Sequence, residues 1–243
     1  MNIDTERLAH LIETSNRIVF FGGAGVSTES GIKDFRSKDG LYNLRSKYGR
    51  PYEEMLSHTY FMNHTKTFYE FYREFMISTT AKPNKAHLYL AELEKRKNLT
   101  IITQNIDGLH QMAGSKNVLE LHGSIHRNYC MDCYSKYDLS VVLNTNDIPR
   151  CPHCGGVIKP EVVLYEEPLD QEVLNSAVEA IASADLIIVA GTSLSVYPAS
   201  GLIRFFNGRY IVVINKEHLY MNQDVTLEIN RPVGEVFSEL PKP

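Results

Sequence analysis

Six short apolar runs constrain the fold of this chain most strongly. They are rich in valine and isoleucine and do not alternate strictly with polar residues, which is typical of parallel strands covered on both faces. Helical patterns lie between several of them, at 4–16, 85–97 and 171–182. This order predicts a doubly wound, Rossmann-like α/β sheet of about six strands. The runs are 17–21, 99–103, 118–121, 162–165, 185–190 and 210–214.

Two regions interrupt the alternation of strands and helices. Residues 37–82 are rich in tyrosine and phenylalanine and predict a helical insert. Residues 125–157 hold every cysteine and few core residues. We therefore expect one large domain, made of 1–36, 83–124 and 158–243, with a small lobe formed by the two inserts.

Charge and hydropathy argue against several classes of protein. The net charge of −4 at pH 7 and the pI of about 6.1 disfavour a dedicated nucleic-acid binder. No stretch approaches the roughly 18 apolar residues of a membrane span, and the charged start lacks the order of a secretion signal. We expect a cytoplasmic protein that contacts neither nucleic acid nor membrane. In that reducing compartment, paired cysteines indicate metal binding before disulfides.

The four cysteines form two C-x-x-C pairs with seventeen residues between them. Two such turns complete a tetrahedral zinc site with bonds of about 2.3 Å. Disulfides or a redox motif are the alternatives, and His153 is a competing but less well-spaced ligand. Four protein ligands leave no position for a reactive water, so the zinc should be structural. The ligands are Cys130, Cys133, Cys151 and Cys154.

A glycine-rich turn, 22–28, follows the first apolar run. Glycines there allow backbone to approach a pyrophosphate, and the next helix offers unpaired N–H groups. The turn lacks the third glycine of the dinucleotide fingerprint and an acidic residue at the usual distance, so a plain strand-to-helix turn is an alternative. A second turn, 191–193, and Asn215 follow two later runs. Ligands lie beyond such strand ends in open parallel sheets, so together they favour a dinucleotide.

Five polar residues follow the first three runs and should meet at one edge of the sheet. Each has a simpler explanation by itself. Asp107 can cap a helix, Arg36 can be a surface cation, and His122 can be a core histidine. Their shared placement favours a functional site. The five are Arg36, Gln104, Asn105, Asp107 and His122.

These motifs and their order resemble the sirtuin family of NAD-dependent protein deacylases, bacterial type. The resemblance covers nearly the whole chain. Departures from the family pattern include Gly22 in place of threonine, Lys33 in place of proline, and Glu166 in place of glycine. The matching segments are 23–36 (GAGVSTESGIKDFR), 103–110 (TQNIDGLH), 121–124 (LHGS), the two C-x-x-C pairs and 191–198 (GTSLSVYP).

The resemblance implies a reaction and the residues that serve it. The amide oxygen of an acyl-lysine attacks the ribose of NAD and nicotinamide leaves. Water then completes the release of free lysine and O-acyl-ADP-ribose. His122 acts as the general base, with Asn105 and Asp107 as the other catalytic residues. The implied contacts to NAD are Gly23, Ala24, Gly25, Thr28, Phe35, Arg36, Gln104, Asn105, Ile106, Asp107, His122, Gly191, Thr192, Ser193, Asn215 and Val233.

The resemblance also implies where the acylated protein binds. Val163 and Tyr165 would line the acyl-lysine tunnel, and the backbone near 166–167 and 195–197 would pair with the substrate chain. Glu166 would place a side chain beside that substrate and favour basic peptides. Succinyl-preferring members carry a Tyr-x-x-Arg pair. Here the stretch holds Tyr69, Tyr72 and Arg73, with the arginine one step and about 100° out of register, so we expect acetyl or another uncharged acyl group.

Other functions remain as alternatives at this point. An ADP-ribosyltransferase would use the same NAD site with another acceptor, and a non-catalytic acyl-peptide binding module would not release nicotinamide. A dehydrogenase is disfavoured, because no hydride-acceptor site or second substrate domain is visible. We expect a monomer whose partners are acetylated proteins or peptides.

Overall fold

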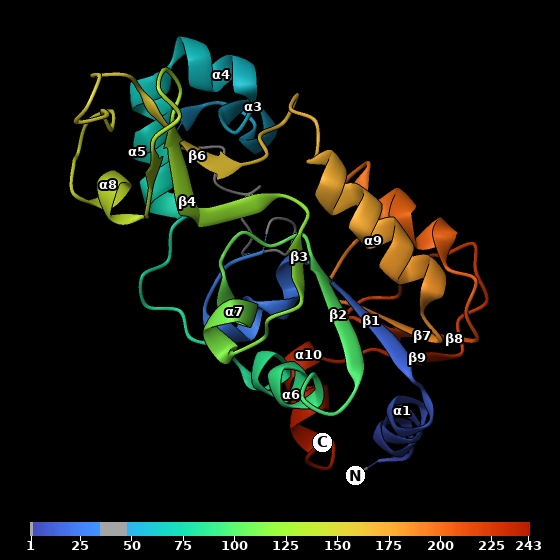
Figure 1. Cartoon of the computed structure of the whole chain (residues 1–243). Helices are drawn as coiled ribbons and strands as arrows, with labels where there is room; N and C mark the ends of the chain where they lie inside the picture. The colour runs from blue at the N-terminus through green and yellow to red at the C-terminus, as the bar shows by residue number, and fades with distance from the viewer. Residues whose placement is uncertain (1, 35–47) are drawn as a thin grey trace.

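The computed structural model describes residues 2–34 and 48–243. Its main layer is a parallel sheet of six strands in the order β3-β2-β1-β7-β8-β9, which confirms the doubly wound fold (Figure 1). The strand order switches between β1 and β7, the position at which open α/β sheets bind ligands. The strands are β1 (Arg17–Gly22), β2 (Asn98–Thr103), β3 (Val118–Glu120), β7 (Leu186–Ala190), β8 (Tyr210–Ile214) and β9 (Leu227–Ile229).

Helices cover both faces of this sheet. Within β1, Ile18 and Phe20 enter one core with residues of α1, α6 and α10, whereas Val19 and Phe21 enter a second core with residues of α9 and η4. Because both faces are buried, the strands need no polar alternation. Figure 1 shows α9 on one side of the sheet, and α1, α6 and α10 on the opposite side. The bounds are α1 (Ile3–Thr14), α6 (Lys85–Leu93), α7 (Leu109–Ala113), α9 (Gln171–Ser183), η4 (Ala199–Phe205) and α10 (Val233–Glu239).

Side-chain caps explain where three of these helices begin. Asn2 accepts N–H bonds at the start of α1, Asn84 at the start of α6, and Asp170 at the start of α9. Such caps satisfy N–H groups that have no partner inside a helix. The helices predicted at 85–97 and 171–182 therefore begin at the expected residues.

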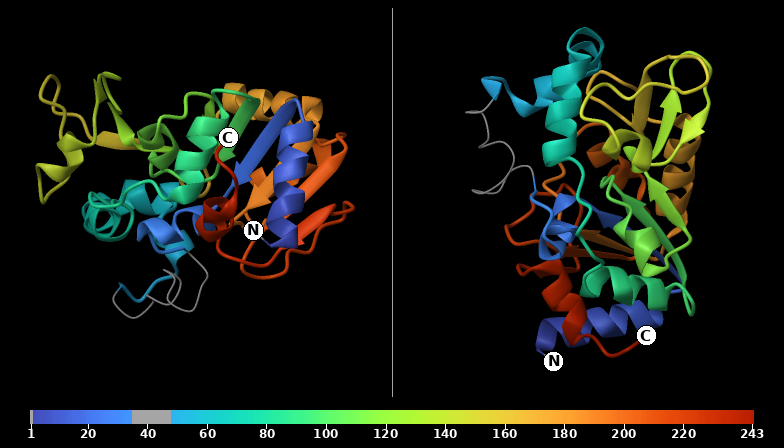
Figure 2. Two further views of the ribbon diagram at one scale, coloured as in Figure 1. Left: turned by 90° about the horizontal axis from the view of Figure 1, so that it is seen from below. Right: turned by 90° about the vertical axis from the view of Figure 1, so that its left-hand side faces the viewer.

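A small lobe contains a second, antiparallel sheet of three strands in the order β5-β4-β6. The helical insert and the cysteine region share one core, because Phe68 and Tyr69 of α5 pack with Ile125 of β4 and Val162 of β6. Figure 2 shows this lobe at the end of the molecule away from both termini. Its elements are α3 (Tyr52–Met55), α4 (His58–Asn63), α5 (Thr65–Phe75), β4 (Gly123–Cys130), β5 (Lys136–Tyr137), α8 (Ser140–Leu143) and β6 (Ile158–Val162).

The structure corrects one predicted strand and adds another. The run 162–165 is not a strand of the parallel sheet: β6 ends at Val162 and pairs antiparallel with β4, and Tyr165 forms only a bridge with Ser57. The sixth parallel strand is β9, which was not predicted from the sequence. It is three residues long and has half-buried Glu228 at its centre, so it has no apolar run.

The division into domains stays a prediction. The three-stranded sheet extends from Gly123 to Val162, slightly beyond the expected limits of 125 and 157.

Across residues 2–34 and 48–243, none of the helices combines the length and apolar character needed to span a membrane.

Candidate active site at the carboxyl edge of the sheet

Two glycine turns pack against each other at the switch point of the sheet. The N–H of Gly25 donates to the carbonyl of Gly191 at 2.8 Å. A Cβ on Gly25 would lie 2.7 Å from the Cα of Gly191, and a Cβ on Gly23 would lie 2.7 Å from the Cβ of Thr192. These glycines are therefore required for the contact between the turns that follow β1 and β7, independently of any bound ligand.

A hydrogen-bonded chain of three side chains connects the turn after β1 with the turn after β2. The amide of Asn105 donates to Ser27 Oγ at 3.0 Å and to the carbonyl of Gly23 at 3.1 Å. Ser27 Oγ donates to Asp107 Oδ2 at 2.6 Å. Ser27 is 1% exposed. Ser27 lies inside the matching motif 23–36, but its position in the sequence did not indicate this role.

Asp107 is hydrogen-bonded to the start of α7, and its burial changes its pKa. Its Oδ1 accepts the N–H of Leu109, the first residue of α7, at 2.9 Å, although the N-cap position itself is Gly108. Burial raises the pKa of Asp107, and the hydrogen bonds from Ser27 and Leu109 oppose that rise.

The imidazole of His122 is held by the backbone that follows β2. Its Nδ1 lies 2.8 Å from the carbonyl oxygen of Gln104. Because a carbonyl only accepts, Nδ1 carries the proton and Nε2 has the lone pair in the neutral ring. Burial lowers the pKa of His122, and the bond to Gln104 partly offsets this. The amide of Gln104 donates to Thr192 Oγ1 at 3.1 Å, which ties this frame to the turn after β7.

The predicted contacts to the rest of NAD lie at several strand ends. Thr28 Oγ1 donates to the carbonyl of Gly25 at 3.0 Å, and Ser193 Oγ lies 2.7 Å from Ser195 Oγ. Asn215 follows β8 and donates to the carbonyl of Glu217 at 3.1 Å. Ala24 and Ile106 are half-buried in the same two turns, after β1 and β2 respectively. Phe35 and Arg36 lie outside the described residues.

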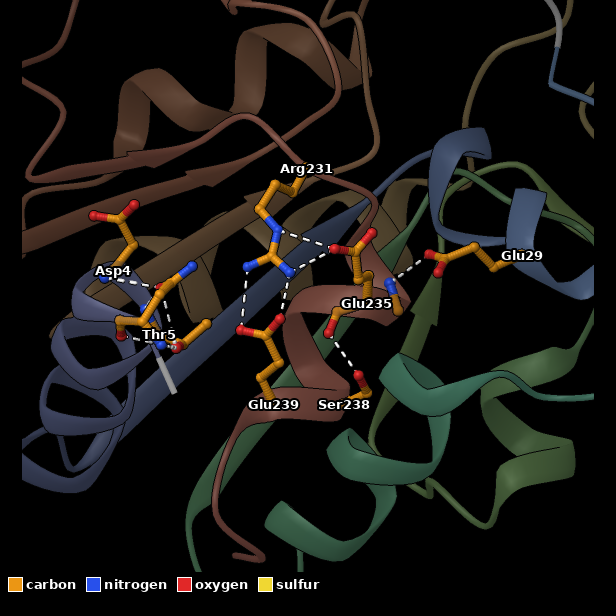
Figure 3. Close-up of polar contacts among 9 residues, drawn as sticks. Asp4, Thr5, Glu29, Arg231, Glu235, Ser238 and Glu239 are labelled. Atoms are coloured by element: carbon orange, nitrogen blue, oxygen red, sulfur yellow. Dashed lines mark hydrogen bonds and ion pairs between the residues drawn. The ribbon is translucent and has the colours of Figure 1, made fainter.

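Val233 lies at the start of α10 and is 2% exposed in the main core, so its side chain offers a ligand almost no surface. The same helix is tied to the turn after β1. Glu29 accepts the N–H of Gly234 at 2.5 Å, while Arg231 donates to Glu235 at 3.2 Å and to Glu239 at 3.1 Å (Figure 3). A contact from α10 to adenine would therefore depend on its backbone rather than on Val233.

The segment after β6 is fixed on both sides. The N–H of Val163 donates to the carbonyl of His122 at 2.9 Å, and the N–H of Tyr165 donates to the carbonyl of Leu56 at 3.0 Å. Glu166 has a φ of 77°, a conformation that favours glycine. Its carboxylate accepts the N–H of Thr59 at 2.9 Å and the Thr59 hydroxyl at 2.6 Å. The side chain of Glu166 is thus turned toward α4, which gives the expected preference for basic peptides no support.

The four cysteines are placed to bind one metal ion. Their Sγ atoms all lie within 4.8 Å of one another, and no disulfide joins them. A tetrahedral zinc site with bonds of about 2.3 Å needs neighbouring sulfurs roughly 3.8 Å apart, and four thiolates are the ligands that zinc prefers. His153 is not part of this cluster among the described residues. The donor set fits a closed, structural zinc site.

Fold and site together define an enzyme with a nucleotide-binding α/β sheet and a structural metal module. The chain belongs to the Sir2 family, whose profile matches residues 23–198, and the predicted membership of the sirtuins is confirmed.

Relatives and solved structures agree with this assignment. The NAD-dependent protein deacetylase of Clostridium acetobutylicum is 56% identical over 232 residues, 95% of each chain. That of Clostridium perfringens is 50% identical over 242 residues, 99% of each chain. A structure of Sir2 with p53 peptide and NAD+ has a TM-score of 0.84 at 37% identity, with 98% of this chain and 96% of that chain covered. Another, with deacetylated p53 peptide and 3′-O-acetyl-ADP-ribose, has a TM-score of 0.88 at 37% identity, with 97% and 96% covered.

Proposed function

We propose that this enzyme removes acetyl groups from protein lysines, cleaving NAD to nicotinamide and transferring the acyl group to ADP-ribose. The observation that supports this most directly is a hydrogen-bonded frame in the turns after β1 and β2: the Gln104 carbonyl fixes the ring of His122, and Ser27 joins Asn105 to Asp107. The relatives named as NAD-dependent protein deacetylases match nearly the full chain.

His122 is proposed as the general base. Its Nδ1 is occupied by the Gln104 carbonyl, so Nε2 is the atom that accepts a proton from a ribose hydroxyl. A pKa lowered by burial keeps the ring neutral, and therefore basic, near pH 7. NAD supplies, when bound, an electrophilic ribose carbon with a cationic leaving group.

Asn105 and Asp107 are proposed to hold the nicotinamide side of NAD. The amide of Asn105 is oriented by two hydrogen bonds, to Ser27 and to Gly23, which keeps its carbonyl in one direction. Asp107 is fixed by Ser27 and Leu109. Side chains oriented before the ligand arrives lower the cost of binding it, which is the contribution we assign to this chain.

The acyl-lysine is proposed to enter beside Val163 and Tyr165. Val163 is bonded directly to the backbone of His122, and Tyr165 is 36% exposed, so the segment connects the catalytic turn to the surface. An extended peptide adds to such a segment mainly through its backbone, and loose sequence preference follows.

An uncharged acyl group is proposed because, among the described residues, the Tyr-Tyr-Arg stretch of α5 leaves no free cation for a succinyl carboxylate. Tyr69 and Tyr72 are 0% exposed in the small-lobe core. Arg73 donates from Nε to the carbonyl of Val142 at 2.8 Å and lies 5.2 Å from the centre of the Tyr69 ring. All three residues serve the packing of α5 against the cysteine module.

The remaining predictions concern the cellular setting. We propose an enzyme that acts on acetylated proteins as a monomer in the cytoplasm, without direct contact to nucleic acid or membrane. The net charge of −4 supports the exclusion of nucleic acid. The solved Sir2 structures that contain p53 peptide support a peptide partner.

Nicotinamide release tests this function against its alternatives. A deacetylase releases nicotinamide only with an acetylated peptide, in proportion to free lysine and acetyl-ADP-ribose measured by mass spectrometry. An ADP-ribosyltransferase would release it with unmodified protein, and a binding module would not release it. His122→Ala should abolish product formation. Succinyl-peptide turnover equal to acetyl-peptide turnover would contradict the proposed acyl preference.

A further inference from the structure

Arg127 of β4 forms two ion pairs with carboxylates from different strands. Its Nη1 lies 2.6 Å from Glu120 Oε2, at the end of β3, and its Nε lies 2.8 Å from Glu161 Oε1, on β6. A guanidinium suits this arrangement, because its donors are fixed in one plane and point in different directions. A lysine ammonium is a single point charge and cannot bind both carboxylates in this way.

The two carboxylates belong to different sheets. Glu120 ends an edge strand of the six-stranded sheet, whereas Glu161 lies in the three-stranded sheet of the small lobe. The chain crosses from one sheet to the other between β3 and β4, and His122 is the residue just before β4 begins. Arg127 therefore connects the two sheets across the turn that carries His122, at the junction visible between β3 and β4 in Figure 1.

The same turn is fixed closely against β6 by its backbone. Gly123 has a φ of 74°, and a Cβ built on it would lie 1.9 Å from the carbonyl oxygen of Glu161. On the other side of the turn, the Val163 N–H donates to the carbonyl of His122. A small displacement of β6 relative to β3 must therefore move the backbone of His122.

The carboxylate of Glu120 depends on this arginine. The side chain of Glu120 is only 8% exposed, and a carboxylate so far removed from water needs a cationic partner. Its charge also acts on the proposed site: burial chiefly raises the pKa of Asp107, and the charge of Glu120 adds to that rise.

We propose that Arg127 is a positioning residue for the reaction, which holds the His122 turn in place by joining the carboxylates of Glu120 and Glu161 across the two sheets. This inference rests on the proposed role of His122 as general base. Arg127 does not itself contact the reacting atoms. It acts by keeping the distance between β3 and β6 constant.

The chain offers a matched control in Lys136. Its Nζ lies 3.0 Å from Glu161 Oε2, so it pairs with the same carboxylate, but it has no contact with Glu120 among the bonds of the described residues. Lys136 is 73% exposed and Arg127 is 47% exposed, so both positions tolerate an unbranched, uncharged side chain. Arg127→Met and Lys136→Met each remove one cation from Glu161, and only the first breaks the connection between sheets.

Steady-state kinetics with acetyl-peptide and NAD test the proposal. Arg127→Met should lower kcat roughly fivefold, well short of the roughly hundredfold that a full ångström of misplacement costs, with KM for NAD nearly unchanged. Arg127→Lys should restore only part of kcat, because charge returns without the planar fork. Lys136→Met should keep wild-type kcat.

Three outcomes would overturn the inference: equal kcat in Arg127→Met and Lys136→Met, full rescue by Arg127→Lys, or a loss confined to KM. If Arg127→Met does not fold, as judged by circular dichroism, the comparison of Arg127→Lys with Lys136→Met decides the question. Wild-type protein that released no nicotinamide with acetyl-peptide would instead refute the proposed function, and the two failures are distinguishable.

Discussion

At the level of single residues, His122 and Glu166 show how one contact sets the chemistry or conformation of a side chain. His122 is held in one tautomer by the Gln104 carbonyl, 2.8 Å from its Nδ1. Glu166 adopts a backbone conformation suited to glycine, and its carboxylate is bonded to the first turn of α4 through Thr59. Neither contact involves residues close in sequence, since the two pairs are 18 and 107 positions apart.

The pKa of His122 leads to a prediction on pH dependence. Burial lowers this pKa below the ordinary value of about 6.5, so the neutral, basic form persists at lower pH. The acidic limb of kcat/KM for acetyl-peptide should therefore have its midpoint below pH 6.5. Rates measured from pH 5 to 8 at constant ionic strength check this. A midpoint at or above 6.5 would show that His122 is not a buried base.

Two substitutions of Glu166 separate its backbone conformation from its carboxylate. Glu166→Gly and Glu166→Ala both remove the bonds to Thr59, but only glycine adopts a φ of 77° without steric cost. The alanine variant should therefore melt about 3 °C below the glycine variant. Thermal unfolding followed by circular dichroism measures the difference. Equal melting temperatures would mean that the segment relaxes to another conformation.

Among the elements, β4 combines two functions along its length. Its first residue, Gly123, directly follows His122, and its last residue, Cys130, belongs to the metal site. In the part of the chain that the structure describes, the buried members of the hydrophobic cluster at the metal end are Cys130, Cys151 and Ile158. The other end of the sheet packs into the small-lobe core through Ile125 and Val162. The metal end has little such burial, so metal bonds should supply most of its stability.

Metal removal should therefore affect activity although no cysteine takes part in the chemistry. The protein should contain one zinc per chain by elemental analysis. Extraction with a strong chelator should abolish most deacetylation and disorder the β5-β4-β6 sheet, whereas the hydrogen-exchange protection of β1 and β7 should persist. Returning zinc should restore activity. Full activity in metal-free protein would contradict the structural role.

At the scale of the whole molecule, the main core contains a pair of histidines that the reaction does not use. His87 of α6 is 0% exposed and His110 of α7 is 2% exposed, and their ring centres lie 4.6 Å apart. His110 packs edge-on against Phe20 of β1. Among the described residues, neither ring nitrogen of His110 has a hydrogen-bond partner. Protonation of either ring would place a charge inside the core that joins α6, α7 and the sheet.

These histidines predict a loss of stability in acid. Burial lowers the pKa of His87 from about 6.5 to about 4, and burial also places the pKa of His110 well below its usual range. Because the unfolded chain then binds more protons, the free energy of unfolding should decrease as pH falls from 6.5 toward 4. His87 accounts for about 3 kcal/mol of that decrease. Urea unfolding at several pH values measures it.

His110→Leu is the matching variant for this prediction. Leucine replaces a ring that makes no hydrogen bonds within residues 2–34 and 48–243, so no partner there is lost and one titrating group is removed. The slope of unfolding free energy against pH between 4 and 6.5 should be smaller in the variant than in the wild type. Equal slopes would mean that other groups, His122 among them, account for the acid sensitivity.

Patterns contained within short segments were predictable. The two C-x-x-C pairs identify the metal ligands, because two thiolates on one turn need no distant residue to be recognised. Five of the six apolar runs match strands of the parallel sheet, since burial on both faces selects Val and Ile locally. The run at 162–165 was misassigned and β9 was missed, because apolar length is a poor guide for short strands at sheet edges.

Local motifs were enough to propose which residues form the site, whereas their hydrogen bonds and burial depend on the tertiary structure. Motif order alone places Asn105, Asp107 and His122 at one sheet edge. Only the fold shows that Ser27 joins Asn105 to Asp107, and that Val233 is buried in the core. The physical reason is distance along the chain: Ser27 and Asp107 are 80 positions apart, and hydrogen bonds and burial depend on separations in space that no local pattern encodes.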